Sequence, residues 1–235
     1  MISVVVCTKR PHLALDVIKR FKNQSIIEKE LILILHTDGQ LPNVQDALRE
    51  YEYKLFNMNR SFSLGECLNF GIRQAKYPVV TKMDDDDYYG GSYLEESYYT
   101  LINQEADIVG KASFYIYFLE RKELRHYNPV QQNRWVTRQG NQRYTARHFL
   151  SGATLTFRKN IIDVIPFSSL SQGEDSEFQM NCYYSGMKIY SSSAKNYVYK
   201  RYPERGHHTS DSLDSALRRR SRFIMYTADL TVSDQ

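Results

Sequence analysis

The chain has 235 residues, enough for one large domain with a buried core and slightly long for two independent domains. Its 31 lysines and arginines against 27 aspartates and glutamates give a formal net charge of +4 at pH 7, too small and too dispersed to indicate a nucleic-acid partner. No apolar run approaches the ~20 residues that span a bilayer, so we expect no transmembrane segment.

The N-terminus and the cysteines bear on the cellular location. Met1 leads almost directly into an apolar run at residues 2–6, without a basic leader or a cleavage site. The cysteines Cys7, Cys67 and Cys182 are odd in number, lie far apart and include no CxxC pair. We therefore expect neither a disulfide framework nor a zinc knuckle. These features predict a cytoplasmic location, at most peripheral at a membrane or cell-envelope surface.

Short β-rich runs alternate with segments of helical period through residues 1–105, which is typical of βαβ units and a mostly parallel sheet. The third helix has a clear start signal, because Ser63 can cap it and Glu66 can reach back to the cap amide. The expected strands cover residues 3–7, 31–35, 53–56 and 79–82, and the expected helices cover residues 13–22, 44–51 and 64–76. Residues 1–105 are thus predicted to form a Rossmann-like nucleotide-binding half.

After residue 105 the pattern changes to aromatic-rich alternation, as at residues 114–118, which favours antiparallel strands. Further strands are expected near residues 153–157, 188–190 and 197–199, with helices at residues 174–184 and from about Ser212. We predict a single α/β domain over residues 1–235, with a second half over residues 106–210 and a C-terminal helical extension over residues 211–235. The exposed-looking aromatic alternation also leaves a homodimer contact open.

Four consecutive aspartates, Asp84 to Asp87, directly follow the predicted strand at residues 79–82. Ligands of open α/β sheets bind at such carboxyl ends of strands. Carboxylates ~5 Å apart repel by roughly 3 kcal/mol at an effective dielectric near 20, and a divalent cation relieves this repulsion. Carboxylate oxygens are hard ligands that suit Mg²⁺ or Mn²⁺. A solvated acidic loop is the alternative, whereas an EF-hand is disfavoured because Tyr89 stands where its loop needs glycine.

With these residues in place, the chain resembles the family-2 glycosyltransferases, inverting enzymes of GT-A fold that move a sugar from a nucleotide donor. Four segments carry the resemblance: VVVCTKRP at residues 4–11, LHTDG at residues 35–39, LGECLNFGI at residues 64–72 and MDDDDYY at residues 83–89. Two departures from the family pattern are Leu68, which replaces an arginine, and the single acidic residue Asp38 after the second strand. The fold implied is a Rossmann-like, mostly parallel sheet flanked by helices, with a smaller antiparallel sheet on the acceptor side.

The resemblance also implies the site. The donor would be a nucleotide sugar, UDP first among the nucleotides, and the cofactor Mn²⁺ or Mg²⁺. Asp175, in the segment QGEDSEF at residues 172–178, would be the general base beside Glu174, and residues 151–153 would form an acceptor-side turn. The implied nucleotide contacts are Thr8, Arg10, Asp38, Asn69, Asp84, Asp85 and Arg205. The implied metal ligands are Asp86, Asp84 and His208, with His207 as the alternative to His208.

We therefore expect an inverting hexosyltransferase that acts on the hydroxyl of an unidentified glycan, protein or lipid-linked acceptor in glycan biosynthesis. Two other classes stay open: a non-catalytic nucleotide-sugar-binding protein of the same fold, and a metal-dependent phosphoesterase. The basic and amide residues of segment 121–147 are compatible with a polar or acidic acceptor. The basic block at residues 218–222 is either a solvated helix end or a site that attracts an anionic surface.

Overall fold

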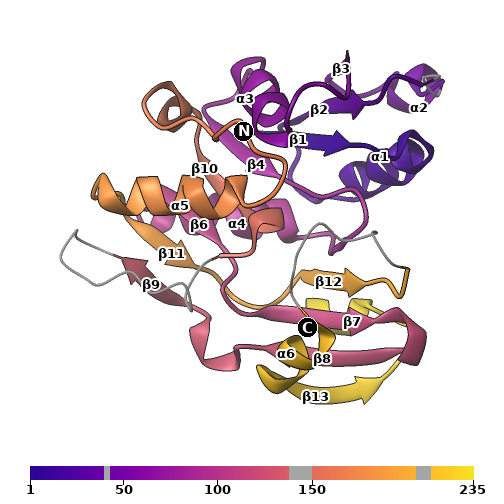
Figure 1. The fold of residues 1–235 in the computed structure, drawn as a ribbon, viewed down its shortest axis with the longest axis vertical. Helices are drawn as coiled ribbons and strands as arrows, with labels where there is room; N and C mark the ends of the chain where they lie inside the picture. Colours follow the sequence, from indigo (N-terminus) through magenta and orange to yellow (C-terminus); the bar gives the residue numbers. More distant parts are fainter. Residues whose placement is uncertain (40–42, 138–149, 205–212) are drawn as a thin grey trace.

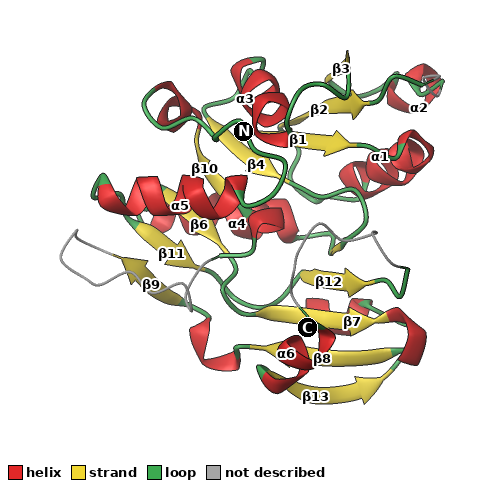
Figure 2. Cartoon of the chain, in the orientation of Figure 1, coloured by secondary structure: helices red, strands yellow, loops and turns green. Residues whose placement is uncertain are grey.

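The structure is a computed structural model and describes residues 1–39, 43–137, 150–204 and 213–235. Within these residues the chain forms two sheets, one below the other in the view of Figure 1. Figure 2 shows the longer helices gathered around the larger sheet, whereas the short helix α6 lies beside the smaller one. This arrangement confirms the expected α/β class.

The larger sheet has eight strands in the order β3-β2-β1-β4-β10-β6-β11-β9. The pairs β3–β2, β2–β1, β1–β4 and β6–β11 are parallel, whereas β10 and β9 run antiparallel to their neighbours. The strands are β1 Ile2–Thr8, β2 Lys29–His36, β3 Tyr53–Met58, β4 Val79–Lys82, β6 Ile108–Gly110, β9 Arg134–Thr137, β10 Thr156–Arg158 and β11 Ile189–Ser191.

Helices cover both faces of this sheet. The strands β1 and β2 are almost entirely buried, as expected for near-continuous apolar runs in a sheet covered on two sides. One face packs against α1 Ala14–Lys22, α2 Gln45–Leu48 and α4 Tyr93–Asn103. The opposite face packs against α3 Leu64–Arg73 and α5 Glu174–Tyr184. The carboxyl ends of β1, β2 and β4 consequently meet at one edge between these layers.

The smaller sheet has five strands in the order β13-β8-β7-β12-β5, all antiparallel except the β7–β12 pair. Its strands are β5 Tyr88–Tyr89, β7 Phe114–Phe118, β8 Glu123–Tyr127, β12 Tyr197–Arg201 and β13 Ser221–Tyr226. In β7, Phe114, Ile116, Tyr117 and Phe118 are buried because the strand lies inside the sheet. The aromatic alternation is therefore core and not exposed as expected, whereas the homodimer itself stays a prediction.

The sequence expectations hold best in the first half. Strands form at all four expected positions, and Ser63 and Glu66 make the reciprocal capping box. The second half differs more, because β6, β9, β10 and β11 join the larger sheet. The expected C-terminal helix is limited to α6 Asp214–Arg219, after which the chain pairs with β8 as β13. None of the helices in the described parts of the chain is long and apolar enough to cross a membrane.

Candidate functional site

The candidate site begins where β1 and β4 end side by side. Thr8 is the last residue of β1, and the acidic run follows β4 on the neighbouring strand. The Thr8 hydroxyl and the Arg10 guanidinium both donate to the carboxylate of Asp85, the latter from Nε at 3.0 Å. The Asp85 side chain is only 5% exposed, so it holds these two groups from a buried position. The direct nucleotide contact implied for Asp85 stays a prediction beside this positioning contact.

Arg10 also links two members of the acidic run. Its guanidinium pairs with Asp85 and lies 2.8 Å from the carboxylate of Asp86. Part of the repulsion expected between neighbouring carboxylates is thus relieved by a protein cation. The backbone carbonyls of the run are held as well, since Arg20 donates to Asp85 and the Tyr202 hydroxyl donates to Asp86 at 3.2 Å. The run has a fixed shape rather than that of a solvated loop.

Asp84 is the member of the run that is most open to a ligand. Its side chain is 41% exposed and forms an ion pair of 2.5 Å with Lys82, whose side chain is buried. Burial alone would lower the pKa of Lys82, but the negative charges of Asp84, Glu174 and Asp175 raise it, so the ammonium group stays charged. Lys82 therefore places a positive charge between the acidic run and the first turn of α5.

Asp87 points inward. Its carboxylate accepts hydrogen bonds from the Tyr197 hydroxyl at 2.7 Å and from the backbone amide of Lys200 at 3.0 Å. Burial, followed by the charges of Asp86 and Asp84, raises the pKa of Asp87 well above its usual range. Asp87 thus anchors the run to β12 and does not offer a further carboxylate to a ligand.

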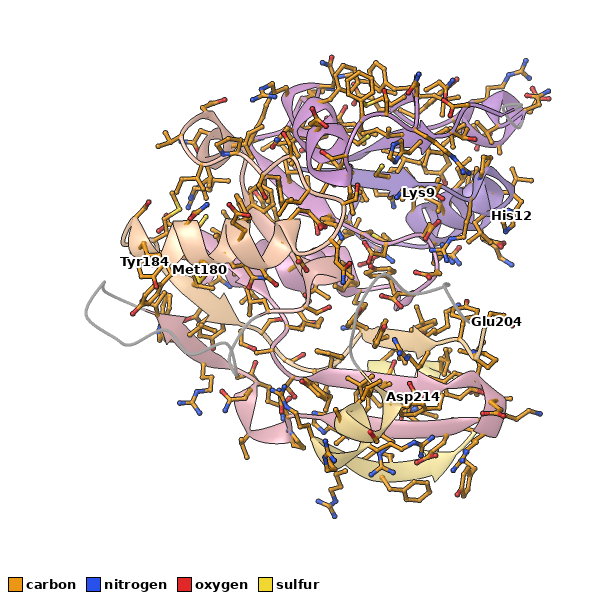
Figure 3. All side chains as sticks on the ribbon, in the orientation of Figure 1. Lys9, His12, Met180, Tyr184, Glu204 and Asp214 are labelled. Carbon is orange, nitrogen blue, oxygen red and sulfur yellow. The ribbon has the colours of Figure 1, made fainter. Side chains whose placement is uncertain are left out.

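The first turn of α5 lies against the turn at residues 151–153. Gly173, the residue before the helix, has φ +81°, a conformation that favours glycine. Asp175 packs so tightly on Gly152 that a Cβ on Gly152 would overlap its carboxylate. Figure 3 shows Met180 and Tyr184, farther along α5, on the side of the molecule away from Lys9, so the first turn is the end of α5 nearer the site.

This turn is tied to the acidic run by two tyrosines. The Tyr89 hydroxyl donates to the Ala153 carbonyl at 2.8 Å and accepts from the backbone amide of Asp84 at 2.8 Å. The Tyr197 hydroxyl, which binds Asp87, also lies 3.3 Å from Ser151 Oγ. The structure therefore brings together Asp84 and Asp175, which stand on distant parts of the sequence.

Glu174 is buried at the start of α5, and its pKa is raised by burial first and then by the charge of Asp175, against the lowering effect of Lys82. The group that faces Gly152 is Asp175, whose Oδ1 also accepts the backbone amide of Ser176 at 2.7 Å. Of the two acidic residues, Asp175 is thus the one held by short local contacts in a defined orientation.

Two of the residues implied as nucleotide contacts, Asp38 and Asn69, lie in different surroundings. Asp38 is exposed after β2 and accepts the backbone amide of Arg60 at 3.1 Å, so it remains available at the edge. Asn69, by contrast, is buried in α3 and uses its amide on the backbone of Phe167, donating at 2.7 Å and accepting at 2.9 Å. The side chain of Asn69 thus fastens α3 to the segment before α5, and its implied nucleotide contact stays a prediction.

Several expected residues lie outside the described part of the chain: Arg205, His207 and His208, and residues 138–147 of the basic and amide segment. Conversely, sequence reasoning missed Lys82, Arg20, Tyr197 and Tyr202. Lys82 carried a signal, since a lysine that ends an otherwise apolar strand is unusual in a buried sheet. The two tyrosines carried none, because their contacts join strands that are far apart in sequence.

The donor set of the acidic run suits a hard divalent cation. Among the described residues the run does not bring three carboxylate oxygens within 4.8 Å of one another, so it is not a preformed three-carboxylate cage. Asp84 is partly exposed, and Asp86 faces the site with its carboxylate against Arg10. Mg²⁺ in particular is often held by one or two carboxylates, with waters and substrate phosphates completing its shell. Asp84 and Asp86 fit that kind of site.

A family model described as "Glycosyl transferase family 2" matches residues 3–165. The O-antigen biosynthesis glycosyltransferase WbnJ of Escherichia coli is 23% identical over 172 residues, which cover 69% of this chain and 63% of that protein.

Two solved structures share the fold. Residues 1–349 of S. aureus TarS, in complex with UDP-GlcNAc, align with a TM-score of 0.70 at 18% identity, covering 90% of this chain and 61% of that one. The mannosyltransferase PcManGT of Pyrobaculum calidifontis, in complex with GDP-Man and Mn²⁺, aligns with a TM-score of 0.61 at 13% identity, covering 88% and 58%. The chain therefore spans less than two thirds of the length of these relatives.

Proposed function

Because the chain belongs to glycosyl transferase family 2, we propose that it transfers a sugar from a UDP-sugar to an acceptor hydroxyl, with a divalent cation and with inversion at the anomeric carbon. The observation that carries this proposal is the meeting of Asp84 and Asp175 across Lys82 at the carboxyl edge of the larger sheet. A donor diphosphate at Asp84 and an acceptor at Asp175 would share one reaction space.

Each side of this space has a distinct chemical role. In the proposed step, the acceptor oxygen bonds to the anomeric carbon as the bond from that carbon to the diphosphate oxygen breaks. Asp175 takes the proton of the acceptor hydroxyl, and the bonding electron pair leaves with the diphosphate. A bound Mn²⁺ or Mg²⁺ would supply the positive charge that stabilises the leaving diphosphate. One displacement of this kind inverts the configuration.

The remaining residues position the donor. Thr8 and Arg10 are fixed by Asp85, and Asp38 lies beyond the end of the neighbouring strand β2. These groups line the edge where nucleotides bind in open α/β sheets. UDP is the first nucleotide to test, since the TarS structure holds UDP-GlcNAc, and GDP is the second, since the PcManGT structure holds GDP-Man.

A non-catalytic nucleotide-sugar-binding protein and a metal-dependent phosphoesterase make different predictions. Calorimetric titration with UDP and Mn²⁺, followed by an assay of UDP-GlcNAc hydrolysis, separates the three classes. The proposed transferase binds UDP only with the cation and releases UDP from the donor. Binding without release supports the non-catalytic protein, and cleavage of a simple phosphodiester supports the phosphoesterase.

A further inference from the structure

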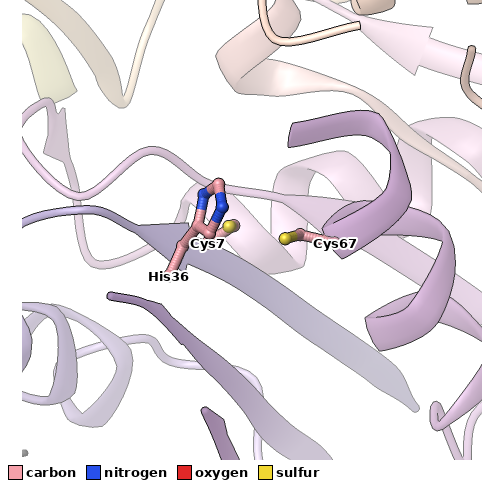
Figure 4. Close-up of side chains that lie close together, drawn as sticks. All are labelled: Cys7, His36 and Cys67. Atoms are coloured by element: carbon pink, nitrogen blue, oxygen red, sulfur yellow. The ribbon is translucent and has the colours of Figure 1, made fainter. Parts of the chain in front are cut away.

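A second group of metal-ligating side chains lies beside the nucleotide edge. Cys7 near the end of β1, His36 at the end of β2 and Cys67 in α3 place their ligand atoms within 4.8 Å of one another. Figure 4 shows the His36 imidazole beside the Cys7 sulfur, with the Cys67 sulfur directed toward them from the helix. All three cysteines, including the distant Cys182, are free thiols.

The imidazole of His36 has no partner that explains its burial. The residue is 1% exposed, and neither ring nitrogen forms a hydrogen bond. The backbone of Phe62 and Asn59 lies near the ring but outside hydrogen-bond geometry. A buried polar atom without a hydrogen-bond partner costs about 1–3 kcal/mol of folding free energy. A metal ion would bind one ring nitrogen of His36, and the nearby backbone groups could pair with the other nitrogen.

We propose that Cys7, His36 and Cys67 bind a zinc ion. Two thiolates and one imidazole are a ligand set that Zn²⁺ favours, and three protein ligands leave a fourth position for water. In a tetrahedral zinc site the sulfur and nitrogen ligands stand about 3.5–3.8 Å apart, so the present cluster closes around the ion with shifts of about an ångström. Cys7 is only partly buried, whereas His36 and Cys67 are buried.

This site is chemically distinct from the acidic run. The hard carboxylates of Asp84 and Asp86 suit Mg²⁺ or Mn²⁺, whereas the thiolates select a softer ion. A zinc ion here would join β1, β2 and α3. Its ligands Cys7 and His36 stand one and two residues before Thr8 and Asp38 in the chain. The ion would therefore fix the end of the sheet on which the proposed nucleotide contacts stand. The zinc proposal rests on the cluster alone and not on the proposed transfer reaction.

A disulfide between Cys7 and Cys67 is the competing explanation of their proximity. It would use both sulfurs but would leave both nitrogens of His36 buried and unpaired, so the zinc site accounts for more of the cluster. Mass spectrometry under native conditions distinguishes the two in protein purified anaerobically and without added reductant. A mass that is two hydrogens below the reduced value, without bound metal, would overturn the zinc site.

The direct test uses cobalt as a spectroscopic substitute for zinc. The 235-residue chain is stripped with a chelator, kept reduced and titrated with Co²⁺. One equivalent is expected to give an intense thiolate-to-cobalt absorption band that Zn²⁺ then abolishes. Cys67→Ser should lose the band, whereas Cys182→Ser, which changes a buried cysteine outside the cluster, should keep it. Asp86→Asn should keep it too, which separates this site from the acidic run.

A second measurement tests the zinc site without any variant, in case Cys67→Ser fails to fold. X-ray absorption at the zinc edge of the wild-type protein loaded with one equivalent of Zn²⁺ should show two sulfur and two nitrogen or oxygen neighbours. A shell of oxygen and nitrogen alone, or no retained zinc after gel filtration, overturns the proposal. An unchanged cobalt band in folded Cys67→Ser overturns it as well.

Discussion

The carboxylate of Asp175 lies directly on the Cα of Gly152, at a place where any Cβ would overlap it. The contact joins the first turn of α5 to the turn that precedes β10. That turn is held to the acidic run through Tyr89. The position of Asp175 relative to Asp84 therefore depends on residue 152 having no side chain.

Gly152→Ala should therefore impair turnover more than donor binding. The added methyl group pushes Asp175 away from its orientation, and a misplacement of about 1 Å can cost 10²-fold in rate. We expect the rate of UDP-GlcNAc hydrolysis to fall by about that factor, with UDP affinity in the presence of Mn²⁺ within a few-fold of wild type. Gly91→Ala, whose Cβ would first meet Asn23 at 3.3 Å, is the control and should keep its rate.

Asp175→Asn tests the proposed base more directly. The substitution keeps the shape of the side chain and removes the proton acceptor, so the transfer rate should fall by ~10²- to 10⁴-fold while the affinity for UDP and Mn²⁺ stays near wild type. Glu177→Gln is the matched control, because it removes one negative charge from the same helical turn. A near-wild-type rate in Asp175→Asn would move the base to Glu174.

The residues that could be predicted from sequence were those with local signals. The apolar runs of β1, β2 and β4, the capping box at Ser63 and the acidic run are all patterns within a few neighbouring residues. Their positions follow from burial and strand order, so the sequence could predict that Thr8 and Asp84 lie at the same edge of the sheet.

The residues that could not be predicted depend on contacts between distant segments. Cys7 and Cys67 stand far apart in sequence and suggested no shared site, yet β1 and α3 pack together and bring both sulfurs to His36. The helical pattern around Asn69 likewise gave no sign that its amide binds the backbone of Phe167. Periodicity assigns a side chain to a face but not to a partner across the core.

Tyr197→Phe should reduce stability, because it removes the hydroxyl that donates to the buried carboxylate of Asp87. The carboxylate would keep only the Lys200 amide, and an unsatisfied buried polar group costs roughly 1–3 kcal/mol. Urea unfolding followed by circular dichroism measures the loss. Tyr184→Phe removes a hydroxyl from a tyrosine that is 74% exposed and should leave the unfolding midpoint unchanged.

Glu123 is expected to stabilise the smaller sheet in a pH-dependent way. It is buried in β8 and pairs with Arg125 at 2.6 Å and with Arg218 of α6. Burial by itself would raise the pKa of Glu123, but the two arginines lower it overall, so the ionised form is favoured in the folded protein. Its contribution is therefore complete above the unfolded value near 4.5 and is lost as the pH falls through the folded pKa.

Glu123→Gln should accordingly lower the free energy of unfolding at pH 7 by roughly 1–3 kcal/mol. The difference in this free energy from wild type should shrink as the pH falls below 4.5. Urea unfolding at several pH values measures both quantities. Glu50→Gln, at an exposed carboxylate near the end of α2, is the control. A difference that is independent of pH would show that the side chain stabilises the sheet by packing rather than by charge.

Asp86→Asn tests the cation proposed for the acidic run. A diphosphate that approaches Asp84 and Asp86 without a cation meets net repulsion, and the variant loses one of the two carboxylates that fit the ion. We expect UDP affinity in the presence of Mn²⁺ to fall by at least tenfold in calorimetry, to about the value that wild type shows with excess chelator. Asp46→Asn, at an exposed carboxylate on α2, should bind as wild type does. If Asp86→Asn or chelator-treated wild type binds UDP with unchanged affinity, then the diphosphate is neutralised by protein groups, and Arg10, which already lies 2.8 Å from Asp86, becomes the first to examine.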